Sequence, residues 1–143
     1  MARGEYVWFF GDDDLIEVNF LAELLKYLKS SAPDIVILNS SSFQEQGQVE
    51  ASRHALDNLK VYEPDDNDLF LADQGGYITY VPCIVIRKKL WEKFFRPEKI
   101  GTFFAHIDTV FPFLETFGGR AGNRCPISLK SFQQNTNLGV ACL

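Results

Sequence analysis

The sequence predicts an α/β fold with a mixed, mainly parallel sheet and flanking helices, and three neighbouring segments support this prediction. Residues 5–10 form a continuous aromatic and β-branched run, which is typical of a strand buried on both faces. Residues 18–28 then repeat apolar side chains at helical spacing, and a second short apolar run follows at 35–38. The order strand, helix, strand indicates a βαβ-like unit, and such units build parallel sheets.

The first helix is expected to begin directly after Asp14 and to end near Ser31, before Pro33. Its buried stripe is predicted from the helical spacing of its apolar residues, which are Val18, Leu21, Leu25 and Leu28, widened by Phe20 and Leu24. From residue 39 to about 68 the chain is mostly polar, which favours a long solvent-facing excursion with room for a short helix or edge strand.

The later half of the chain is expected to continue with alternating strands and helices. Residues 77–80 and 83–86 have strand-like composition, residues 88–95 and 104–117 have helical patterns, and residues 126–132 form one further strand candidate. Pro112 would kink the longer of these helices or lie in its first turns. With 143 residues, 46% hydrophobic and 23% charged, the chain fits a single domain over residues 1–143.

Charge and hydropathy exclude several classes of function. The net charge of -5 argues against nucleic-acid binding, which usually needs a basic face. No apolar stretch reaches the roughly 20 residues of a membrane span, and the N-terminus lacks the apolar core of a signal peptide. The three cysteines show no metal-ligand spacing and fit a reducing compartment. These features predict a cytoplasmic protein and are compatible with peripheral attachment at the inner face of a membrane.

Three consecutive aspartates, Asp12, Asp13 and Asp14, stand where the first predicted strand ends. Ligands of open α/β sheets bind outside the carboxyl ends of strands, and adjacent carboxylates repel unless a cation or solvent compensates. Mn²⁺ and Mg²⁺ take carboxylate oxygens and bridge to phosphates, so the pattern suits a nucleotide-diphosphate ligand. The alternative is structural: Asp14 caps the following helix and Glu17 completes a capping box, which explains one aspartate of the three.

The string from Ala2 to Asp14, with its aromatic strand followed by glycine and the acidic triplet, resembles the segment of family 2 glycosyltransferases that leads into their DXD-type motif. Its form Tyr-Val-Trp-Phe-Phe-Gly-Asp-Asp-Asp looks most like the abequosyltransferase-like branch that acts in bacterial O-antigen assembly. The resemblance implies a GT-A fold and inverting transfer of a sugar from a nucleotide-diphosphate donor to a saccharide or lipid-linked saccharide acceptor. It further implies that Asp12 and Asp14 contact the metal, Mn²⁺ or Mg²⁺, and that all three aspartates contact the donor.

The resemblance also implies that the chain is the later part of a catalytic domain, because family members place a nucleotide-binding half before the acidic motif. We therefore expect that N-terminal half to be missing here. An inverting transferase needs a base for the acceptor hydroxyl. Family members place an acidic base near the start of a helix in this region, which makes Asp108 the candidate, with His106 as its alternative or helper. The structural alternative is that Asp108 caps the helix and His106 is a half-buried polar residue.

A second class of function is a non-catalytic carbohydrate- or protein-binding module that keeps this part of the fold. Metal binding at the triplet discriminates the two, because a binding module does not require it. Phosphoryl transfer is disfavoured, because residues 12–16 lack the Asp-x-Asp-x-Thr/Val pattern. The chain has 13 phenylalanines, and an exposed sheet edge with so many rings would favour homo-oligomers.

Overall fold

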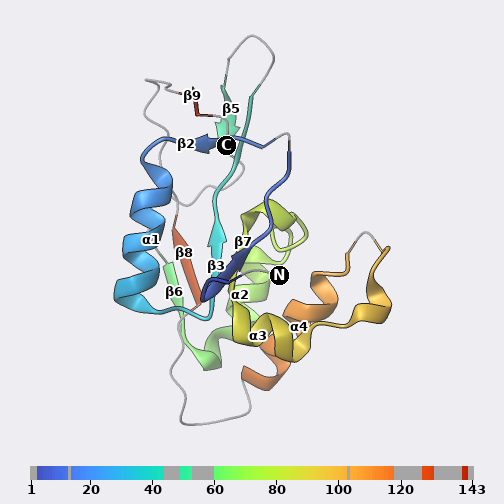
Figure 1. The fold of residues 1–143 in the computed structure, drawn as a ribbon. Coiled ribbons are helices and arrows are strands. Elements are labelled where there is room, and N and C mark those ends of the chain that lie inside the picture. The colour runs from blue at the N-terminus through green and yellow to red at the C-terminus, as the bar shows by residue number, and fades with distance from the viewer. Residues whose placement is uncertain are drawn as a thin grey trace.

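The computed structural model describes residues 3–12, 14–43, 49–52, 60–102, 104–117, 127–130 and 140–141. Within them a central sheet lies between helix α1 (Phe20–Ser31) on one side and helices α2 (Asn67–Gln74), α3 (Lys88–Phe94) and α4 (Ile107–Phe117) on the other (Figure 1). The mixed α/β class expected from the sequence is confirmed. None of the described helices is long and apolar enough to cross a membrane.

The central sheet has five strands in the order β1 (Tyr6–Trp8), β7 (Ile84–Arg87), β3 (Ile35–Leu38), β8 (Ile127–Lys130), β6 (Lys60–Tyr62). Only β3 and β8 pair in parallel, whereas β1 with β7, β7 with β3 and β8 with β6 pair antiparallel. The expectation of a mainly parallel sheet is therefore not confirmed within the described residues.

The physical reason lies in the position of β7, which enters the sheet between the two strands of the predicted βαβ-like unit. Because β1 and β3 both pair antiparallel with β7, they run in the same direction, as a strand–helix–strand unit requires. Chain order suggested that the two strands are neighbours, but a later strand separates them. Within the described strands β1 is at an edge of the sheet, so its residues are half-buried rather than buried on both faces.

Helix α1 begins at Phe20, six residues after Asp14, so the prediction of a helix directly behind the aspartates was wrong. The short strand β2 (Ile16–Glu17) precedes it and pairs with β9 (Val140–Ala141). The predicted buried stripe is confirmed in part: Leu24 and Leu28 are buried, whereas Val18, Leu21 and Leu25 are exposed. Two stripes at helical spacing share this helix, and spacing alone could not tell which one faces the sheet. The helix ends as expected, with Ala32 in the left-handed conformation as its C-cap.

The two faces of the sheet differ in the size of the core that they bury. Side chains alternate along β3, so that Ile35 and Ile37 face the three-helix side and Val36 and Leu38 face α1. The three-helix side holds the larger cluster, which includes the fully buried Phe70 of α2. Burial of one such ring stabilises the fold by about 2–3 kcal/mol, so this side supplies most of the apolar stabilisation.

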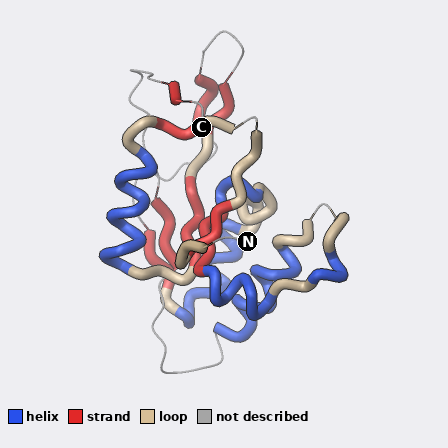
Figure 2. Tube along the Cα trace, in the orientation of Figure 1, coloured by secondary structure: helices blue, strands red, loops and turns tan. Residues whose placement is uncertain are grey.

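Several other elements agree with the sequence and some do not (Figure 2). The strand at 83–86, the helices at 88–95 and 104–117 and the strand at 126–132 are confirmed as β7, α3, α4 and β8. Residues 77–80 form turns rather than a strand, and α2 was not predicted. The polar excursion contains a two-stranded sheet of β4 (Ser41–Phe43) and β5 (Val49–Ser52). Short 3-10 helices complete the described chain: η1 (Pro64–Asp66), η2 (Val81–Cys83) and η3 (Pro97–Lys99).

Candidate functional site

The acidic turn after β1 is held by the side chain of Asp14. Its Oδ2 accepts a hydrogen bond of 3.0 Å from the backbone N–H of Gly11, which folds the turn back on itself. Its Oδ1 accepts a hydrogen bond of 3.1 Å from the hydroxyl of Tyr80, far along the chain. Asp14 does not cap α1: the N-cap position is Asn19, and no side-chain hydrogen bond is made there. The capping explanation of this aspartate was therefore wrong.

The other two aspartates of the triplet differ from Asp14 in what the structure describes. Asp12 is exposed at the turn, and Asp13 lies outside the described residues. The described residues contain no group of three or more side chains suited to hold a metal ion. Two carboxylates nevertheless fit a hard divalent cation, because Mg²⁺ is usually held by one or two carboxylates together with waters and substrate phosphates.

The N-terminus of α4 is anchored by His106, which is 6% exposed. Its Nε2 lies 3.1 Å from the backbone carbonyl oxygen of Ile78. Since a carbonyl only accepts, Nε2 carries the proton and donates it in this bond. Burial lowers the pKa of His106 below its usual value, although the backbone hydrogen bonds to Ile78 and Thr79 oppose this shift. The expected half-buried histidine is in fact a buried one that fastens a helix end to a turn.

Asp108 lies two residues further, in the first turn of α4, and is partly exposed. Its backbone N–H donates to the carbonyl oxygen of Phe104 at 3.4 Å, and the backbone N–H groups of Thr109 and Val110 donate to the carbonyl oxygen of His106. These N–H groups at the start of the helix are thereby satisfied by backbone carbonyl groups. Within the described residues no side-chain hydrogen bond or ion pair of Asp108 is present, so its carboxylate remains open to a ligand.

One short segment, residues 78–82, connects both of these regions. Ile78 accepts from His106, Tyr80 donates to Asp14, and the carbonyl oxygen of Pro82 accepts a 2.8 Å hydrogen bond from the indole N–H of Trp8. The end of β1, the acidic turn and the start of α4 therefore share one support. The two groups of site residues predicted from the sequence are linked through it.

Tyr80 is the member of this arrangement that sequence reasoning missed. The residues around it were predicted as a strand, and in a strand its hydroxyl would have had no particular target. The glycine pair Gly75–Gly76 was the available indication that the chain turns here. It could place the turn, but it could not name the residue that contacts Asp14.

A second titratable cluster lies on the far edge strand β6 and is saturated by its own contacts. Lys60 forms an ion pair with Asp73, and the buried hydroxyl of Tyr62 donates to the same carboxylate at 2.7 Å. The hydrogen bond from Lys60 lowers the pKa of Asp73, and burial raises the pKa of Tyr62. This cluster joins β6 to α2, and its ionisable groups pair with one another.

The acidic turn lies in a part of the chain that matches a known protein family. The family "Glycosyl transferase family 2" matches residues 1–104, which is well over half of the chain. The chain belongs to glycosyl transferase family 2. The matched range includes the whole acidic triplet and the 78–82 segment. It ends before His106 and Asp108, so the family match supports the acidic turn more directly than the helix start.

A curated relative is similar over most of the family 2 chain. Abequosyltransferase RfbV of Salmonella typhimurium (strain LT2) is 25% identical over an alignment of 127 residues, and the alignment covers 82% of this chain. The aligned part spans 38% of the length of that relative. The resemblance inferred from the acidic motif is thereby confirmed at the level of the family and of this relative.

Proposed function

We propose that this chain carries the donor-binding acidic turn and the catalytic base of a glycosyltransferase that acts in the synthesis of bacterial surface polysaccharide. The reaction is transfer of a sugar, with inversion, from a nucleotide-diphosphate donor to a saccharide or lipid-linked saccharide acceptor. The observation that carries the proposal is the ordered carboxylate of Asp14 beside the exposed Asp12, in a chain of family 2. Residues 1–143 are proposed to form one part of a single catalytic domain.

The proposed metal ligands are Asp12 and Asp14, and Asp13 is proposed to contact the donor. Each carboxylate oxygen of Asp14 has one hydrogen-bond donor from the protein, which leaves lone pairs for a cation. A bound Mn²⁺ or Mg²⁺ would supply the positive charge that a diphosphate leaving group requires. The role of this chain's own residues is to hold the two carboxylates at a fixed turn, so that little reordering accompanies donor binding.

Asp108 is the proposed base that accepts the proton of the acceptor hydroxyl as its oxygen bonds to the anomeric carbon and the bond to the diphosphate breaks. Its partial exposure and open carboxylate support this assignment. His106 is less suited to the same task, because it is buried and its Nε2 proton is already committed to Ile78. Its proposed role is to hold the start of α4, and with it Asp108, against the 78–82 segment.

Calorimetric titration of the chain with Mn²⁺ and a nucleoside diphosphate tests the acidic turn directly. We expect binding of the diphosphate to require Mn²⁺ and to be lost in the double variant Asp12→Ala/Asp14→Ala. A matched control is Asp65→Ala/Asp68→Ala, which removes two exposed aspartates from η1 and α2 and should bind as the parent does. Far-UV circular dichroism of each variant excludes loss of the fold.

Two outcomes would contradict the proposal. If neither parent nor variants bind Mn²⁺ and diphosphate, the acidic turn is not a donor site in this chain, and a carbohydrate- or protein-binding module becomes the better interpretation. If the control variant loses binding as well, the effect reports total charge rather than these two carboxylates.

A further inference from the structure

Positive charge is concentrated in one short stretch of an otherwise acidic chain. Between residues 87 and 104 there are six basic and two acidic residues, although the whole chain has a net charge of -5. This stretch contains α3, η3 and the turn that leads to α4. A local excess of the opposite sign indicates a partner with negative charge.

Two of these basic residues are used by the fold and four remain exposed. Arg87 forms an ion pair of 2.9 Å with Asp34, and Lys88 pairs with Glu92 at 3.4 Å. The other four are exposed and have no carboxylate partner within the described residues: Lys89, Lys93, Arg96 and Lys99. The ammonium of Lys93 lies 4.9 Å from the ring centre of Phe94.

Two large, exposed apolar residues follow these cations in the chain, Ile100 directly after Lys99 and Phe104 four residues later. Ile100 is 69% exposed and Phe104 is 55% exposed, and Ile100 has the highest exposure of the large hydrophobic residues that the structure describes. Gly101 between them has a φ of 98°, a left-handed conformation that glycine adopts without strain. Ile100 is therefore part of a turn of defined conformation.

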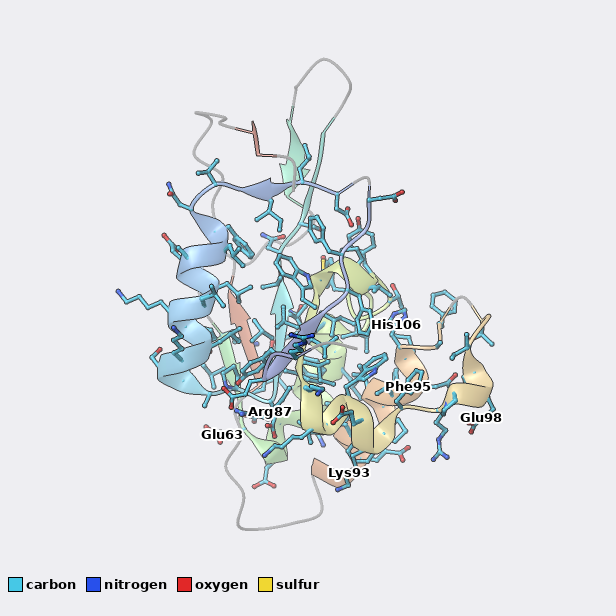
Figure 3. The ribbon with its side chains drawn as sticks, viewed as in Figure 1. Glu63, Arg87, Lys93, Phe95, Glu98 and His106 are labelled. Carbon is cyan, nitrogen blue, oxygen red and sulfur yellow. The ribbon has the colours of Figure 1, made fainter. Side chains whose placement is uncertain are left out.

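Backbone hydrogen bonds hold this turn in shape. The N–H of Ile100 donates to Pro97 at 3.1 Å, the N–H of Thr102 donates to Lys99 at 3.1 Å, and the Thr102 hydroxyl donates to the same Lys99 carbonyl at 3.0 Å. In Figure 1 the η3 segment and its flanks project beyond α3 and α4, and in Figure 3 Lys93 and Glu98 lie at the outside of this region. A projecting, ordered turn can approach a flat surface.

We propose that this region attaches the protein to an anionic membrane. The α3–η3 surface, as we define it, consists of Lys89, Lys93, Arg96, Lys99, Ile100 and Phe104. Its four cations bind the phosphate groups of acidic lipids, and Ile100 and Phe104 enter the boundary between headgroups and acyl chains. Basic side chains next to exposed apolar ones are the composition that binds such interfaces, and each cation near the surface strengthens binding about fivefold.

The composition favours a lipid surface over other partners. A symmetric dimer through this surface would bring four cations against four cations, which repel. A nucleic acid has few apolar groups that could contact the aliphatic side chain of Ile100. The acidic chain as a whole would also repel its phosphates. The exposed apolar residues of α1 have less positive charge around them, because α1 carries two lysines, Lys26 and Lys29, and the acidic Glu23.

The α3–η3 surface is continuous with the start of α4. The carbonyl oxygen of Phe104 accepts hydrogen bonds from the N–H groups of Ile107, at 2.9 Å, and Asp108, at 3.4 Å. Attachment here would bring Asp108 close to the membrane, where a lipid-linked acceptor would be found. Membrane binding itself requires neither metal nor donor, so it succeeds or fails independently of the proposed transferase function.

Cosedimentation of the full chain with lipid vesicles tests the proposal. We expect binding to phosphatidylcholine vesicles that contain about 30% phosphatidylglycerol, no binding to pure phosphatidylcholine, and loss of binding when salt rises from about 0.05 M to about 0.5 M. Lys93→Glu/Lys99→Glu should lower the partition coefficient at least about 25-fold, since two charges are removed and then reversed. Ile100→Ser/Phe104→Ser should also release the chain from the vesicles.

Matched changes on α1, on the opposite side of the sheet, serve as controls: Lys26→Glu/Lys29→Glu for charge and Leu21→Ser/Leu25→Ser for apolar surface. Both should bind as the parent does. The proposal is overturned if the parent fails to bind anionic vesicles at low salt, or if the α1 variants lose as much binding as the α3–η3 variants. It is also overturned if Ile100→Ser/Phe104→Ser converts a dimer to a monomer in light scattering without affecting lipid binding. The salt dependence of the parent tests attachment to anionic lipid without any variant, and the comparison of the two sets of variants tests which surface binds.

Discussion

The acidic turn after β1 and the start of α4 hold a carboxylate in opposite ways. At the acidic turn the carboxylate of Asp14 itself holds the turn, because it accepts hydrogen bonds from the N–H of Gly11 and the hydroxyl of Tyr80. Its neighbour Asp12 is exposed. At α4 a different residue holds the local structure: the buried His106 hydrogen-bonds the carbonyl oxygen of Ile78. The carboxylate of Asp108 is partly exposed and makes no side-chain hydrogen bond within the described residues.

The difference suggests what each region can do chemically. A carboxylate that is fixed by two donors suits a stationary charge, such as a metal ligand, because its position changes little when a cation binds. A carboxylate that is free of such donors suits proton transfer, because its oxygens can accept the proton of a bound hydroxyl group. Variants that change either the carboxylates or the groups that hold them test whether the two regions have these different roles.

The largest effect is expected from Asp108→Asn. The amide keeps the shape of the side chain and removes its basicity, so turnover of a nucleotide-sugar donor should fall by about 10²–10⁴-fold. Binding of Mn²⁺ and nucleoside diphosphate should be unchanged, because the acidic turn is intact. Steady-state kinetics together with calorimetry check both expectations. If the variant had normal turnover, Asp108 would not be the base, and the proposed difference in function between Asp14 and Asp108 would be wrong.

The next largest effect is expected on stability, from loss of the His106 hydrogen bond that holds the start of α4. His106→Ala removes the donor to the Ile78 carbonyl and leaves a buried acceptor unpaired, which should cost about 2 kcal/mol in the free energy of unfolding. His106→Gln, which offers an amide N–H instead, should recover part of that loss. Urea denaturation measures both. By contrast, Asp12→Ala should change stability by less than about 0.5 kcal/mol, because Asp12 is exposed.

A smaller effect is expected at the acidic turn from Tyr80→Phe. This change removes one hydrogen bond to Asp14 and should cost about 1 kcal/mol in stability. A double-mutant cycle with Asp14→Ala isolates the contact, because Tyr80 makes other interactions as well. If the two changes were additive, Tyr80 would not hydrogen-bond Asp14 in solution. Residues 78–82 would then not support the acidic turn through this contact.

The sequence predicted much of the fold because its strongest patterns are local. Apolar runs located β1, β3 and β7, and the repeat of rings located α4, since burial of these side chains dominates the energy of each element. Local patterns carry no information on which strands become neighbours, so the insertion of β7 between β1 and β3 could not be foreseen. The same limit applies to α1, where two apolar stripes compete and the sheet selects one.

The sequence indicated the acidic residues of the candidate site, but it did not indicate the residues that hold them in place. The acidic triplet stands out because adjacent like charges at a strand end require an explanation. Tyr80 and Ile78 give no comparable indication, because a tyrosine hydroxyl and a backbone carbonyl acquire a role only when the fold brings Asp14 and His106 to them. His106 was singled out as a base or helper, and its burial shows that bracing is the role its surroundings favour.

The smallest expected effect is a pH dependence that arises from His106. Burial lowers its pKa in the folded chain below the usual value of 6.5, so the unfolded chain takes up a proton at a higher pH than the folded one. Between about pH 6.5 and the lowered pKa the unfolded state binds more protons, and the free energy of unfolding therefore decreases as the pH falls. Above about pH 6.5 the contribution is fully present, since the imidazole is then neutral in both states. Urea denaturation at a series of pH values should show this decline in the parent and a flatter profile in His106→Gln. The matched control is His54→Gln, which removes the other histidine and should keep the decline. A steep profile in His106→Gln would assign the proton uptake to other groups, and the imidazole would then brace α4 without sensing pH.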